Sequence, residues 1–158
     1  MTFILAKERN LNASIAFRNY NKYLRENESR FPKGAYALAS SDWWHDFNDH
    51  KCPHDAWLES AIFAESSFGE RNEFRLITLT IRLFGAYHDG YIELIYSGVH
   101  AYKIDMSNAG QGHGGWRYDE FCVNEKGHLV HEIEWEIYGH KGSWLIECSD
   151  IDYRWIPI

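Results

Sequence analysis

Residues 128–138 read His-Leu-Val-His-Glu-Ile-Glu-Trp-Glu-Ile-Tyr, and charged and apolar side chains alternate along most of this stretch. A period of two is typical of a β-strand with one buried face. One face of the predicted strand is apolar, and the other carries the carboxylates of Glu132, Glu134 and Glu136. Because like charges stacked along one face repel, we expect these glutamates to face outward, where solvent, neighbouring cations or a basic partner compensates their charge.

The same period of two recurs along the chain from about residue 56 onward. Turn sequences that contain glycine, such as 88–90 and 125–127, separate several of the alternating runs. Glycine at these positions supplies the positive φ that tight hairpins need. The runs therefore predict a mainly antiparallel sheet built from strands near 56–65, 73–83, 91–97, 99–105, 117–123, 128–138, 143–148 and 151–156.

An amphipathic helix is predicted before the strands, from about Asn12 to Glu28, because apolar residues recur there at three- and four-residue spacing. Residues 35–54 are irregular and rich in Trp and His, and a short helix could begin there at Ser41 or Asp42. The two tryptophans and the phenylalanine of this segment, Trp43, Trp44 and Phe47, are expected to fill one end of the core.

The expected fold is a single α+β domain over residues 1–158. Its parts are a helical N-terminal region (1–34), an irregular Trp/His-rich segment (35–54) and a β-rich core (55–158). We expect the N-terminal helix to pack on a curved, mainly antiparallel sheet in a two-layer or sandwich-like arrangement.

The composition and charge of the chain limit the class of protein to which it can belong. The chain has 158 residues, of which 45% are hydrophobic and 16% aromatic, so it can bury a substantial core. Its net charge of −7 argues against nucleic acid as the main partner and favours a basic protein. No apolar run reaches the roughly 18 residues of a membrane helix, and the first residues lack the long apolar region of a signal peptide. We therefore expect a cytoplasmic protein that does not interact with membranes.

A possible metal site is the alternative to a protein-binding function. His45, His50, Cys52 and His54 are crowded into ten residues, and zinc binds such ligands. Their spacing matches no zinc finger or metalloprotease motif, so we favour surface or hydrogen-bonded structural histidines. A metal- or small-ligand-binding module, or a hydrolase that uses this cluster, remains the alternative hypothesis.

Signals of catalysis are weak elsewhere in the sequence. No Gly-x-Ser-x-Gly elbow positions a nucleophilic serine, and the glycine-rich stretch 110–115 lacks the Gly-Lys-Ser/Thr ending of a phosphate-binding loop. We therefore expect neither an enzyme nor a bound cofactor.

Trp116 is the best candidate for an exposed aromatic anchor. It follows the glycine-rich stretch and precedes the acidic residues Asp119 and Glu120, and such a composition is common in protein interfaces. We expect Trp116, Asp119 and Glu120 to join the three glutamates of residues 128–138 in a partner-binding surface.

Residues 54–105 also carry a resemblance. His54-Asp55-Ala56-Trp57-Leu58 is followed by a long alternating strand that ends in 83–90, and then by residues 91–99, which read Tyr-Ile-Glu-Leu-Ile-Tyr-Ser-Gly-Val. This pattern resembles the small acidic immunity proteins of bacterial polymorphic-toxin and contact-dependent inhibition systems. The resemblance implies a sheet-rich fold without catalytic residues, and tight neutralisation of one cognate protein toxin, such as a nuclease. A domain that binds a protein other than a toxin is a further alternative.

Overall fold

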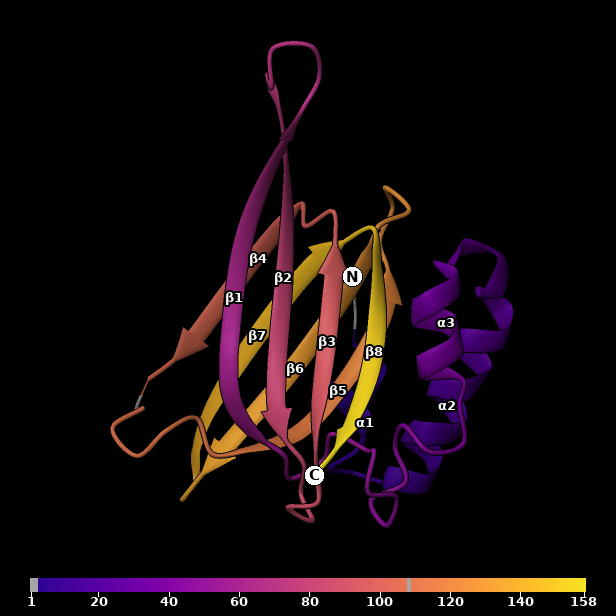
Figure 1. Ribbon diagram of the computed structural model, residues 1–158. Helices are drawn as coiled ribbons and strands as arrows, with labels where there is room; N and C mark the ends of the chain where they lie inside the picture. Colours follow the sequence, from indigo (N-terminus) through magenta and orange to yellow (C-terminus); the bar gives the residue numbers. More distant parts are fainter. Residues whose placement is uncertain (1–2, 108) are drawn as a thin grey trace.

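The computed structural model describes residues 3–107 and 109–158, and in this part of the chain three helices precede eight strands (Figure 1). A single 3-10 turn, Glu28–Arg30, lies between the second and third helices. The helices are α1 (Ile4–Glu8), α2 (Ala13–Glu26) and α3 (Lys33–Ala39). The strands are β1 (Trp57–Phe68), β2 (Phe74–Phe84), β3 (Gly90–Ser97), β4 (Ala101–Met106), β5 (Gly115–Val123), β6 (Leu129–Ile137), β7 (His140–Cys148) and β8 (Asp150–Pro157). The predicted α+β class and all eight predicted strands are confirmed.

The strands form one antiparallel sheet that is not closed, in the order β4-β7-β6-β5-β1-β2-β3-β8. Four of its neighbouring pairs are sequential hairpins, whereas β4–β7, β5–β1 and β3–β8 join strands far apart in the chain. The β5–β1 pairing is short, because it pairs only Trp57 with Gly115 and is extended by two backbone hydrogen bonds at Trp116. This junction divides the sheet into two halves of four strands.

The two halves fold over each other and enclose the core. The Tyr96 hydroxyl of β3 lies 2.8 Å from Nδ1 of His131 on β6, although four strand-to-strand steps separate β3 from β6 in the sheet. Apolar side chains from both halves fill the space between them. The buried side chains of β2, β6 and β7 include Leu79, Ile81, Leu83, Ile133, Trp135 and Trp144. The arrangement is therefore sandwich-like, as expected.

The helix α2 forms where the sequence predicts it and covers the edge of β5. Asn12 caps its first turn by accepting a hydrogen bond from the Ile15 N–H at 3.0 Å. The Tyr20 hydroxyl both accepts from the Phe121 N–H and donates to the Phe121 carbonyl, each at 2.8 Å. The Tyr23 hydroxyl accepts from the Val123 N–H at 3.0 Å. Side chains of α2 thus satisfy backbone groups of β5 that no neighbouring strand pairs.

The helix α3 was not predicted, since residues 35–54 were expected to be irregular with a helix start at Ser41 or Asp42. The helix instead begins after Pro32, ends at Ala39 and packs beside β8 (Figure 1). The Asp150 carboxylate accepts hydrogen bonds from the N–H groups of Gly34 and Ala35, which are unpaired at the start of a helix. The first turn of α3 is therefore fixed by a residue from the far end of the chain.

Segment 40–56 follows as a series of turns. Trp44 is fully buried and Trp43 packs against the core, as expected, whereas Phe47 is 41% exposed and does not fill the core. None of the helices in residues 3–107 and 109–158 has the length and hydropathy needed to cross a bilayer.

Candidate functional site

The three glutamates of β6 lie on one face of the strand, as predicted, and this face is only partly open to solvent. All three are half-buried, and Glu134 and Glu136 are paired with cations. Glu134 forms ion pairs with Arg9 and, at 3.7 Å, with Lys141. The Arg117 guanidinium lies 3.6 Å from the Glu136 carboxylate. The acidic row therefore lies on the face away from the core, where neighbouring cations compensate part of its charge and the N-terminal segment covers part of it.

Glu132 and Glu120 are neighbours on this covered face, where β5 and β6 pair. Burial raises the pKa of Glu132, and the nearby Arg9 opposes this shift. Glu120 is only 1% exposed, and its carboxylate accepts hydrogen bonds from the N–H groups at the start of α1. Burial raises the pKa of Glu120 to about 7 even though those N–H donors lower it. Glu120 therefore holds α1 on the sheet and is not the surface residue that the sequence predicted.

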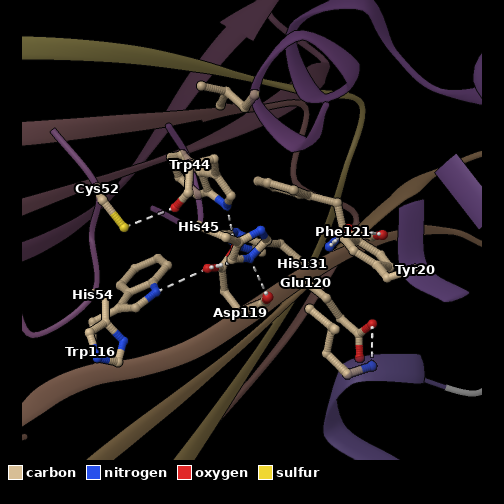
Figure 2. Close-up of polar contacts among 12 residues, drawn as sticks. Tyr20, Trp44, His45, Cys52, His54, Trp116, Asp119, Glu120, Phe121 and His131 are labelled. Atoms are coloured by element: carbon tan, nitrogen blue, oxygen red, sulfur yellow. Dashed lines mark hydrogen bonds and ion pairs between the residues drawn. The ribbon is translucent and has the colours of Figure 1, made fainter. Parts of the chain in front are cut away.

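Trp116 and Asp119 are also buried, at 1% and 5% exposure, so the prediction of an exposed anchor at Trp116 is wrong. Figure 2 shows three ring N–H groups around the Asp119 carboxylate. Nε1 of Trp44 and Nε2 of His131 each lie 2.8 Å from Oδ2, and Nε1 of Trp116 lies 3.2 Å from Oδ1. The carboxylate thus joins aromatic residues from separate parts of the chain in the core.

The charge of Asp119 is stabilised by its neighbours. Burial alone would raise the pKa of Asp119, but hydrogen bonds and charge from His131 and His45 outweigh burial and hold that pKa well below its usual range. Burial lowers the pKa of His131, although Asp119 opposes the shift. For His45, burial would likewise lower the pKa, but the interactions with Asp119 raise it. This network is a structural element of the core, and an ionised Asp119 is its acceptor.

The residues of the possible metal site point to different partners. Nδ1 of His50 lies 2.5 Å from the Asp89 carboxylate, and the Cys52 thiol donates to the Trp44 carbonyl. His54 stacks on Phe47 with ring centroids 3.6 Å apart, while His45 contacts Asp119. Among the described residues, no three His, Cys, Asp or Glu side chains are grouped in a way that could hold a metal ion. The structure therefore does not bring His45, His50, Cys52 and His54 together as ligands.

A hollow of about 580 Å³ lies between α2 and the segment after α3, with His45, Ser40 and Ser41 in its lining. The Ser40 hydroxyl donates to the Tyr36 carbonyl, and the Ser41 hydroxyl donates to the Leu38 carbonyl. Both hydroxyl protons are engaged by backbone, so neither serine is arranged as a nucleophile activated by His45.

The β1–β2 hairpin carries an exposed apolar surface. Figure 1 shows the hairpin extending beyond the end of β3, whose pairing with β2 starts at Leu79. Paired residues on neighbouring antiparallel strands share a face, and alternate residues along each strand do so too. On one face of the hairpin four large side chains are exposed by 43–58%. We call this set the apolar hairpin surface, and it comprises Ile62, Phe68, Phe74 and Leu76.

Aromatic contacts order side chains on both faces of the hairpin. Phe68 and Phe74 pair across the strands and stack with ring centroids 5.3 Å apart. On the other face, Phe63 contacts Tyr102 of β4 with ring centroids 4.4 Å apart. Sequence reasoning missed this surface because it assigned all alternating apolar residues to the core. The one available signal was the length of the two strands around the turn at 69–73.

Comparisons with protein-family models, with curated proteins and with solved structures find no match to this chain. The candidate site is therefore defined by geometry alone, and the apolar hairpin surface is its most distinctive part.

Proposed function

We propose that this protein is an immunity protein that binds and neutralises one basic protein toxin, and that the apolar hairpin surface makes the central contact. The observation that carries the proposal is the exposure of Ile62, Phe68, Phe74 and Leu76 on a hairpin that projects from the body of the protein. Large apolar side chains exposed on one face are costly in water and are typical of surfaces that a protein partner covers.

The charge of the hairpin supports a basic partner. Its acidic residues outnumber its basic ones, and Arg75 is already paired with Glu65 at 2.8 Å. The whole chain carries a net charge of −7. Such a field accelerates the approach of a cationic protein, while desolvated aromatic residues supply most of the lasting affinity. The glutamates of β6, which are half-buried and partly paired, contribute to the field and are not proposed as direct contacts.

The resemblance of residues 54–105 to immunity proteins supports the same proposal and motivates the choice of a toxin as partner. The residues that show this resemblance include β3 and the beginning of β1. Both strands pair with β2 and so connect the hairpin to the rest of the sheet.

The test begins with capture of partners from the native bacterium by the tagged wild-type protein and by a Phe74→Ser/Leu76→Ser variant. A Leu11→Ser variant is the control, because Leu11 is also exposed but lies outside the hairpin. A captured basic protein is then expressed in a heterologous bacterium, where it should stop growth. Wild type and control should restore growth, whereas the hairpin variant should not.

The expected loss of affinity in the hairpin variant is on the order of 30-fold or more per residue, since central aromatic and aliphatic contacts contribute about 2 kcal/mol each. Full protection by a correctly folded hairpin variant would exclude the apolar hairpin surface as the contact. A captured protein without toxicity would contradict the immunity function.

A further inference from the structure

One long edge of the sheet has no strand beside it. β1 pairs with β2 along its whole length, but on its other side it meets β5 only at Trp57. Residues 60–68 therefore have no neighbouring strand on this side within residues 3–107 and 109–158. Figure 1 shows β1 as the outer strand of the layer that it forms with β2, β3 and β8.

This edge lacks the protection that the edge of β5 has. The edge of β5 is covered by hydroxyl groups of α2, as described above. Residues 60–68 read Ser-Ala-Ile-Phe-Ala-Glu-Ser-Ser-Phe and contain no Pro, Lys or Arg, the residues that usually prevent pairing between edges. Glu65 is the only charge in this stretch, and Arg75 neutralises it. An exposed edge of this kind pairs readily with another strand.

We propose that the edge of β1 pairs with the same edge of a second copy, in an antiparallel arrangement with a two-fold axis at Ala64. A two-fold axis makes any edge strand complementary to itself. In an antiparallel pair, two residues that lie opposite each other point to the same face of the sheet. A two-fold axis between two residues would pair side chains that point to opposite faces, so the axis must pass through a residue. The axis at Ala64 uses all of residues 60–68 and stops at the irregularity between Leu58 and Ser60.

The register at Ala64 also avoids a conflict of charge. It places Glu65 of each copy opposite Phe63 of the other, where no like charge faces it. An axis at Ile62 would place Glu65 opposite Glu59. Because residues 60–68 can pair with themselves in this register, we propose a second copy of the chain as the partner of this edge. The proposed dimer does not depend on the proposed binding of a toxin.

The dependence on salt concentration distinguishes formation of the dimer from binding of a toxin. Each copy carries a net charge of −7, so two copies repel each other and their pairing should strengthen as salt screens the charge. Binding of a basic toxin should instead weaken as salt rises.

The first measurement is the mass of the purified full chain by sedimentation equilibrium, over a range of protein concentrations at low and high salt. We expect a shift from 18.6 kDa toward twice this mass, at lower concentration in high salt. An Ala64→Lys variant should stay monomeric, because it places two like charges together at the axis. A mass that stays at 18.6 kDa at every concentration and salt would overturn the proposal.

Disulfide formation tests the register. Two Ala64→Cys chains bring their Cα atoms within about 5.5 Å at the axis, which a disulfide can span. The native cysteines Cys52, Cys122 and Cys148 are buried and do not interfere. Thr78→Cys is the control, since Thr78 pairs with Ala64 one strand further in and would lie about 14 Å from its counterpart.

We expect a covalent dimer from Ala64→Cys on mild oxidation and none from Thr78→Cys. Equal cross-linking of both variants would show random collision and would overturn the arrangement. If the Ala64→Cys thiol is protected only when a captured toxin is present, the edge belongs to that partner and the proposed dimer is wrong.

Discussion

Replacement of Asp119 by alanine would remove the acceptor of three buried N–H groups. These belong to Trp44, Trp116 and His131, all of which are at most 1% exposed. His131 uses Nε2 as the donor to Asp119, so its Nδ1 is free to accept from the Tyr96 hydroxyl. Loss of the carboxylate therefore disturbs contacts among both halves of the sheet and the segment after α3.

The size of the effect follows from the number of orphaned donors. A buried donor without an acceptor costs roughly 1–3 kcal/mol, so three of them cost about 3–9 kcal/mol. Domains of this kind have free energies of unfolding of about 5–15 kcal/mol, so the variant should be close to unfolding. Asp119→Asn keeps one oxygen for the two donors at 2.8 Å but turns its amide N–H toward the Trp116 N–H, so two donors lack an acceptor and the cost should be roughly 2–6 kcal/mol.

The assay is urea unfolding at neutral pH, followed by tryptophan fluorescence. With a slope of about 1–3 kcal/mol per molar urea, Asp119→Ala should lower the midpoint by at least about 1 M. Asp105→Ala, at an exposed aspartate of β4, is the matched control and should leave the midpoint unchanged. A free energy of unfolding for Asp119→Ala within about 1 kcal/mol of wild type would refute the reasoning.

Two further predictions concern the contacts of β5. The pKa of Glu120 is raised from 4.5 to about 7, so the folded state binds an extra proton between these pH values and its stability falls as pH rises through this window, by roughly 3 kcal/mol. Glu120→Gln should remove this slope from the free energy of unfolding measured at successive pH values, and an unchanged slope would contradict the assignment. Tyr20→Phe leaves the N–H and carbonyl of Phe121 without a partner and should cost roughly 2–6 kcal/mol in urea unfolding, whereas a cost below about 1 kcal/mol would show that these groups find other partners.

Local patterns were sufficient to predict the secondary structure from Ala56 onward and the helix after Asn12. Strand periodicity and glycine turns are properties of neighbouring residues, so the eight strands could be recognised. The order of the strands could not, because the β3–β8 and β4–β7 pairings join distant segments. Helix α3 was missed because the group that caps it, the Asp150 carboxylate, lies far along the chain.

The candidate site was harder to predict for a related reason. Alternation correctly placed Glu132, Glu134 and Glu136 on one face, but it contains no information about whether another segment covers that face. Asp119 and Trp116 looked like a surface composition because acidic residues are usually exposed. Their burial depends on ring N–H donors that come from elsewhere in the sequence.

The contact between α2 and β5 has a consequence for synthesis of the protein. The Tyr20 hydroxyl bonds to a residue 101 positions later in the chain. At a translation rate of about 5–20 residues per second, the helix waits about 5–20 s for its binding strand to be made. During this time its apolar face has no native partner, so the nascent chain is a natural substrate for chaperones until β5 emerges from the ribosome.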